Sequence, residues 1–336
     1  MSFKVAALAG AAMLALVAGS ASAADLACLI TKNNTNPFFV KMKEGAEAAA
    51  AAAGLDFQAY AGEKDGDAAP QITAIENCVA AGAKGILITP SNDSVGPALK
   101  AARAAGILVI ALDTPLADGE AQDITFATDN FEAGLLIGKW AAATMGDTSG
   151  AKIAMLDINK DNISVDVQRD TGFLVGFGIE VPDLTVMGSE TDPRVIGHES
   201  SDANPEGGLR AMETLLAKDP DINVIYTINE PAAEGAFQAM KNAGKEAQAI
   251  IVSVDGGCPG VASVKSGVIG ATSQQYPLKM AGLGIDAIAA YAKDGTKPTV
   301  TEGLSFFNTG VNLVTDKPAE GVPSIDTTEG TALCWG

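Results

Sequence analysis

Four polar residues, Asp113, Asn229, Asp255 and Gln275, each stand where an apolar run of the sequence stops. Carboxyl ends of parallel strands meet at one edge of a sheet, and open α/β sheets bind their ligands at that edge. A turn or cap explains any single one of these residues. Because the pattern recurs in both halves of the chain, it favours a binding site.

These side chains suit a neutral polyol. Asp113 and Asp255 are ionised acceptors, Arg169 is a fork of donors, and the amides of Asn36 and Gln275 both donate and accept. Charged partners make strong hydrogen bonds to buried hydroxyl groups, and a missing bond is costly. One arginine against two aspartates does not suit a carboxylate or phosphate ligand.

The segment Asn36-Pro37-Phe38-Phe39 is expected to begin a helix, with Asn36 as its cap and Pro37 in the first turn. Only one of Phe38 and Phe39 is expected to face the core. The other would lie over the crevice, where its ring can contact the C–H face of a sugar. The alternative is that both rings belong to the core.

Enzyme and metal motifs are scarce. The sequence has no GxGxxG after its first strand, no P-loop and no GxSxG elbow, so no cofactor is expected. The single histidine, His198, is predicted to be a solvated loop residue, which leaves a zinc site without partners. Asp113 with Asp255 or Glu230 could form a glycosidase pair, although nothing favours this over binding. The segment 157–161 resembles the start of a calcium loop but departs from it later, so calcium is not expected.

Apolar, strand-like runs alternate with helical patterns in both halves of the chain, which predicts two similar α/β lobes with doubly wound parallel sheets. In the first half we expect strands at 26–31, 57–60, 85–89 and 107–112, and helices at 37–53, 69–81, 94–105 and 130–145. In the second half we expect strands at 152–156, 185–187, 223–228, 249–254 and 268–272, and helices at 165–176, 205–217, 231–243, 258–266 and 278–291.

Residues 1–23 have the pattern of a cleaved signal peptide, with Lys4, an apolar run and Ala21-Ser22-Ala23, so the mature chain is expected to begin at Ala24 in an exported compartment.

A formal net charge of −19 argues against nucleic acid and anionic membranes as partners. The four cysteines permit disulfides in an oxidising compartment, with three possible pairings.

Several short motifs occur in an order and spacing that resemble the periplasmic sugar-binding proteins of ABC transporters, in the ribose-binding cluster. The resemblance covers essentially the whole mature sequence. The motifs are Asn36-Pro37-Phe38-Phe39, Leu112-Asp113, Arg169 to Phe173, Asn229-Glu230, Val254-Asp255-Gly256 and Gln275-Tyr276-Pro277.

The resemblance implies which residues contact the sugar. These are Asn36, Phe38, Phe39, Asp113, Arg169, Asn229, Asp255 and Gln275, with Lys32, Thr114, Asp202 and Asn204 as further candidates. Ribose binders have other residues at Lys32 and Thr114 and a third aromatic near 200–204, which argues against ribose itself. The segments INEPAAEGA, QQYP and CWG resemble a branch associated with fructose, which is the first expectation.

The family fold implies three crossings between the lobes. The expected limits are 24–128 with 276–308 for the N-terminal lobe, and 129–275 with 309–336 for the C-terminal lobe. Members close on their ligand by hinge bending and dock on an inner-membrane permease, so a periplasmic, monomeric transport component is expected. A sensor for chemotaxis or signalling without transport is an alternative from another class, and a glycosidase is a third.

The lobe limits also bear on the cysteines. Cys258 and Cys334 both fall in the C-terminal lobe, so they are predicted to pair. Cys28 and Cys78 both fall in the N-terminal lobe, where they could pair or remain separate core thiols.

Overall fold

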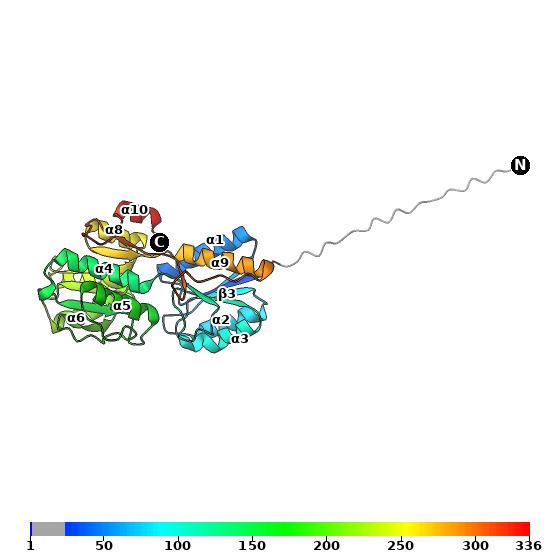
Figure 1. Ribbon diagram of the computed structural model, residues 1–336, viewed down its shortest axis with the longest axis horizontal. Coiled ribbons are helices and arrows are strands. Elements are labelled where there is room, and N and C mark those ends of the chain that lie inside the picture. The colour runs from blue at the N-terminus through cyan, green and yellow to red at the C-terminus, as the bar shows by residue number, and fades with distance from the viewer. Residues whose placement is uncertain (2–23) are drawn as a thin grey trace.

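The computed structural model describes Met1 and residues 24–336, and the predicted leader and its cleavage site lie outside the described residues apart from Met1. Figure 1 shows two α/β lobes side by side, each built on a six-stranded sheet. The helices in the described part of the chain include none that is both long and apolar enough to cross a membrane.

The first sheet has the strand order β11-β5-β4-β3-β1-β2. Its strands are β1 (Leu26–Thr31), β2 (Asp56–Ala61), β3 (Gly85–Ile88), β4 (Leu108–Leu112), β5 (Ile124–Ala127) and β11 (Phe307–Asn308). The first lobe also holds α1 (Pro37–Ala53), α2 (Ala69–Ala80), the 3-10 turn η1 (Asp93–Val95), α3 (Gly96–Ala104) and α9 (Pro277–Asp294).

The second sheet repeats this plan with the order β12-β10-β9-β8-β6-β7. Its strands are β6 (Ile153–Asp157), β7 (Val195–Ser200), β8 (Val224–Thr227), β9 (Ile250–Asp255), β10 (Ala271–Gln274) and β12 (Asn312–Val314). The second lobe also holds α4 (Asn130–Met145), η2 (Thr148–Gly150), α5 (Ser164–Phe177), α6 (Pro205–Lys218), α7 (Glu230–Asn242), α8 (Cys258–Ser266) and α10 (Thr327–Leu333).

Both lobes match the predicted fold class, with parallel pairing throughout except between β10 and β12. Each sheet is covered on both faces. In the first lobe α1 and α9 pack together, while α2 and α3 pack together elsewhere. The strands alternate accordingly, since Leu29 joins the core cluster under α1 and α9, whereas Cys28 and Ile30 join the one under α2 and α3.

The predicted helix start at Asn36 is confirmed. Its side-chain oxygen accepts a hydrogen bond from the Phe38 N–H at 3.0 Å, and Pro37 is the first helical residue. Of the two possibilities left open for Phe38 and Phe39, the structure supports the second, because both rings are buried and belong to one core cluster. They lie edge to face, with their centroids 5.4 Å apart.

Two predictions for the second lobe are wrong. Residues 185–187 form no strand, and the edge strand is instead β7, ten residues later. His198 lies in this strand, not in a solvated loop, and it is held by carboxylates on both ring nitrogens. Strand β5 was not expected from the sequence.

Helices α4 and α5 approach closely through glycines. A Cβ added at Gly134 or Gly138 would collide with the backbone of α5, and one added at Gly172 or Gly176 would collide with the backbone of α4. The absence of side chains at these four positions lets the two backbones meet.

Disulfide bonds join Cys258 to Cys334, the pairing that the sequence predicts, and Cys28 to Cys78, for which the sequence left two possibilities open. The first of these bonds fastens the segment after α10 to α8. The neighbouring Trp335 packs against Phe38, with ring centroids 5.5 Å apart, and its indole N–H donates to the backbone oxygen of Gln275 at 2.7 Å. Trp335 is thus anchored to the second lobe through its neighbour Cys334, while its ring reaches into the core cluster of the first lobe.

Candidate functional site

A cavity lies between the two lobes and is lined by all eight of the principal site residues expected from the sequence. The first lobe contributes Lys32, Asn36, Phe38, Phe39, Asp65 and Asp113 to its lining. The second lobe contributes Arg169, Asn229 and Asp255, and Gln275 lines it from the connection between the two lobes. The cavity has a volume of about 40 Å³. Asn36 and Asp65 also line an adjoining cleft of about 630 Å³. A ligand larger than the cavity would extend into this cleft.

The two aspartates occupy equivalent positions in the two lobes. Asp113 follows β4 and Asp255 ends β9, and these strands hold the same place in their sheets. Asp113 has a φ of 64° and Asp255 a φ of 127°, values that side chains other than glycine seldom adopt. Strained backbone at matching positions facing one cavity is typical of functional residues.

Arg169 lies between these two carboxylates. Its guanidinium nitrogens are 3.9 Å from Asp113 Oδ1 and 3.6 Å from Asp255 Oδ1, and all three side chains are about 6 % exposed. Arg169 also donates to Asn130 Oδ1 at 2.8 Å and to the Ile228 carbonyl at 3.0 Å. The arginine is therefore held by both backbone and side-chain partners, and it reaches across the crevice.

Buried acceptors remain free for a ligand in this cavity. Asp113 Oδ1 and Gln275 Oε1 are buried and accept no hydrogen bond from any described residue. The amide of Gln275 donates to Asp255 Oδ1 at 2.7 Å, and the Thr114 hydroxyl donates to Asp113 Oδ2 at 2.8 Å. Buried polar atoms without a partner are uncommon, and a ligand hydroxyl would satisfy these two.

The four further candidates from the sequence lie in different places. Lys32 lines the cavity, whereas Thr114 lies behind Asp113 and lines a different hollow. Asp202 and Asn204 line the larger cleft, where Asp202 pairs with Arg210 and Asn204 caps α6. Asn229 also lines the cavity, but both ends of its amide already bond backbone groups.

Sequence reasoning missed two polar residues of the site. Asp65 lines both hollows, and burial, the main effect, raises its pKa, although Lys32 acts in the opposite direction. Asn130 orients the Arg169 guanidinium from α4. Neither residue ends a strand. Asp65 follows a lysine in a polar loop, and only the packing of α4 against α5 brings Asn130 to Arg169.

Glu230 lies beside the cavity but is occupied by the protein itself. Its carboxylate accepts the N–H groups of Gly256 and Gly257, at 2.8 and 3.0 Å, and the Thr272 hydroxyl at 2.8 Å. These bonds hold the turn after Asp255. The carboxylate is thus used to shape the site, which disfavours Glu230 as one of a glycosidase pair.

The unfolding free energy of the protein is expected to fall as the pH rises from about 4.5 to about 8 because of Glu230. Burial raises the pKa of Glu230 from 4.5 to about 8, and Asp255 adds to the rise. Between these values the folded state holds more protons than the unfolded state, so raising the pH favours unfolding. Urea unfolding of the parent and Glu230→Gln at pH 5, 6.5 and 8 measures this, and the variant should show the shallower dependence.

The exposed Glu47 of α1 provides a matched control. Glu47→Gln should retain the parent's pH dependence. Equal slopes in the parent and in Glu230→Gln would contradict the assignment to Glu230.

Comparisons with known proteins show the family and the fold of this chain. Residues 27–297 match the family described as "Periplasmic binding protein domain". The ribose import binding protein of Haemophilus influenzae is 34% identical over 284 residues, which cover 84% of this chain and 91% of the relative. The D-allose-binding periplasmic protein of Escherichia coli is 26% identical, with 83% and 88% covered.

A solved structure is similar over nearly its whole length. The periplasmic ribose ABC transporter structure from Conexibacter woesei has a TM-score of 0.71 and 25% identity, and the match covers 88% of this chain and 94% of that one.

Proposed function

Because this chain belongs to the periplasmic binding protein family, as a type I protein of the ribose-binding cluster, we propose that it binds one neutral monosaccharide between its lobes. The observation that carries the proposal is the Asp113–Arg169–Asp255 arrangement, with buried acceptors still free beside it. Hydroxyl groups match such a set of charged donors and acceptors, and the Phe38 and Phe39 rings offer apolar surface.

D-Fructose is the first sugar to test, since the sequence segments INEPAAEGA, QQYP and CWG resemble a fructose-associated branch. D-Ribose and D-allose are the alternatives that the relatives' names suggest. Lys32 and Asp65 line the cavity and would add a cation and a carboxyl group to the contacts with the sugar hydroxyls.

The moving bodies in this proposal are residues 24–128 with 276–308 and residues 129–275 with 309–336. The strand orders support this division, because β11 belongs to the first sheet and β12 to the second. A sugar that contacts both lobes shifts an open–closed equilibrium toward the closed form. As a monomer in the periplasm, the closed form would then deliver the sugar to an ABC permease.

Thermal unfolding against a panel of D-fructose, D-ribose, D-allose and D-glucose tests the function, because a ligand that binds only the folded state raises its stability. We expect one or more of these sugars to raise the midpoint without being consumed. No shift with any neutral monosaccharide would refute sugar binding, and turnover of a glycoside would favour the glycosidase alternative.

The affinity for the sugar is expected to fall as the pH drops through about 6. Burial raises the pKa of Asp255 to about 6, although Arg169 and Gln275 act against the rise. Below this pH the carboxyl takes up a proton and no longer offers a charged acceptor, so binding weakens. Calorimetric titrations between pH 4.5 and 7.5 measure the dependence.

The isosteric variant Asp255→Asn is the matched control for this prediction. It should bind weakly throughout, with a flatter pH profile than the parent. A parent profile that does not change through pH 6 would contradict the role of Asp255.

A further inference from the structure

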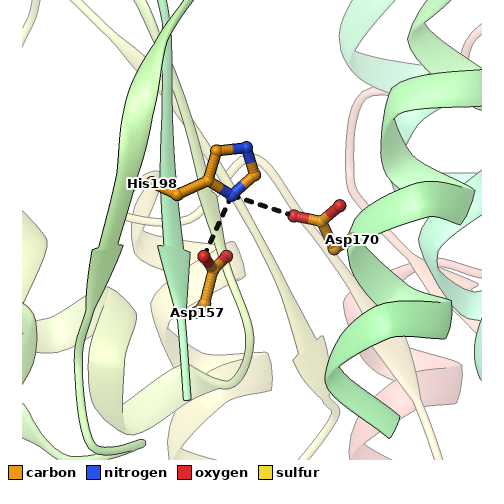
Figure 2. A group of neighbouring side chains, drawn as sticks. All are labelled: Asp157, Asp170 and His198. Carbon is orange, nitrogen blue, oxygen red and sulfur yellow. Dashed lines mark hydrogen bonds and ion pairs between the residues drawn. The ribbon is translucent and has the colours of Figure 1, made fainter. Parts of the chain in front are cut away.

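A second polar cluster joins β6, β7 and α5 outside the lining of the sugar cavity. Figure 2 shows His198 from β7, Asp157 from β6 and Asp170 from α5 pointing toward one another. His198 Nδ1 lies 2.9 Å from Asp157 Oδ2 and 3.4 Å from Asp170 Oδ2. None of the three residues lines the cavity or the adjoining cleft.

The other ring nitrogen of His198 is fixed by a fourth residue. Nε2 lies 2.8 Å from Glu190 Oε1, in the segment before β7. A neutral imidazole that donates its proton from Nε2 to a carboxylate presents the lone pair of Nδ1 on the opposite side. In this cluster Nδ1 faces two carboxylates, so it donates a proton to them when the ring is an imidazolium and offers them its lone pair only when a cation lies between. The same carboxylate–histidine arrangement orients histidine ligands in metal sites.

Asp170 provides an independent observation. Its side chain is completely buried, and neither carboxylate oxygen accepts a hydrogen bond from any described group. Asp157 Oδ1 is buried and unpartnered as well. Buried carboxylates are normally paired or bound to a cation, because an unpaired buried charge is costly. Two of them converge here on one imidazole nitrogen.

We propose that Asp157, Asp170 and His198 bind one divalent transition-metal ion, with Zn²⁺ as the expected occupant and Glu190 as a positioning residue. An ion about 2.1 Å from each ligand atom requires those atoms to lie within about 4.2 Å of one another. The two distances from Nδ1 meet this limit, and the three ligand atoms lie within 4.8 Å of each other, so at most a shift of a few tenths of an ångström between the two carboxylates completes the set. An imidazole among carboxylates fits Zn²⁺ or Mn²⁺, whereas Ca²⁺ and Mg²⁺ select oxygen ligands alone.

The ion would connect three elements of the second lobe. It joins β6, the edge strand β7 and helix α5, and through Glu190 it also holds the segment that leads into β7. Asp170 directly follows Arg169 in α5. The site would therefore fix the helix that carries the central arginine of the sugar cavity without contacting the sugar.

The experiment uses the full chain purified without a histidine tag, because His198 is then its single imidazole. After removal of metal by a chelator, calorimetry with ZnCl₂, MnCl₂ and CaCl₂ should show one site that binds Zn²⁺ and excludes Ca²⁺. Asp170→Asn should weaken Zn²⁺ binding by about 100-fold or more, and Glu190→Gln by about 10- to 100-fold. Asp161→Asn, an exposed carboxyl of the loop after β6, is the control and should bind like the parent.

Nitrogen NMR of the single histidine gives a readout independent of affinity. With Zn²⁺ the Nδ1 signal should move to the range of a metal-bound nitrogen, while Nε2 remains protonated. If Asp170→Asn does not fold, His198→Gln replaces it in the titrations. The proposal is overturned if no ion binds and both ring nitrogens carry protons, or if Zn²⁺ binds equally to the parent and to His198→Gln.

Discussion

Replacing Arg169 by lysine is expected to weaken sugar binding by about 100-fold or more, a loss of about 3 kcal/mol. The guanidinium lies between Asp113 and Asp255 and also donates to Asn130 and the Ile228 carbonyl. A lysine ammonium is a point charge that cannot reproduce this fork. Calorimetric titration with the sugar that gives the largest thermal shift measures the change.

Arg210 supplies the matched control for this substitution. It pairs with Asp202 at the larger cleft but is 61% exposed, so Arg210→Lys should bind within about twofold of the parent. Circular dichroism of Arg169→Lys should show native secondary structure. An affinity of this variant equal to that of the parent would contradict the central position of Arg169 in the site.

Gly134→Ala is expected to lower the unfolding free energy by about 3 kcal/mol and to weaken sugar binding as well. The added methyl group would collide with the backbone carbonyl of Arg169, which helix α5 can relieve only by moving away from α4. That movement displaces the guanidinium from both aspartates. Urea unfolding and sugar titration measure the two effects on the same variant.

Gly282 provides the matched control, a glycine within a helix where an added methyl group meets no neighbour. It lies within α9, and an added Cβ would have no neighbour within 4 Å. Gly282→Ala should be neutral or stabilising by up to about 1 kcal/mol, because alanine favours the helix. Parent-like stability of Gly134→Ala would show that α4 and α5 are less tightly packed than described.

The sequence predicted the two-lobe fold because most strands are short apolar runs followed by amphipathic helices. It failed at β7, Val195–Ser200, whose residues are mostly polar or small because the strand lies at the sheet edge and is half-buried. Strands β11 and β12 have only 2 and 3 residues, so tertiary contacts define them. No local pattern marks such segments.

The candidate site was predictable where its residues end central strands or begin helices, as Asp113, Asp255 and Asn36 do. Asp65 and Asn130 could not be found in this way, because only the folded chain brings them to the cavity. The same applies to His198, whose partners Asp157, Asp170 and Glu190 come from three different segments. Side chains that are distant in sequence meet only through packing.

The burial of Trp335 against Phe38 affects when the first lobe can fold during synthesis. That lobe takes its first strand from residues 26–31, but it receives α9, β11 and Trp335 from the last fifth of the sequence. A ribosome adds roughly 5–20 residues per second, so the early strands wait on the order of ten seconds for these late segments. During this interval the sheet face that α9 covers remains open. The nascent chain therefore cannot complete its first lobe until nearly all of the sequence has been made.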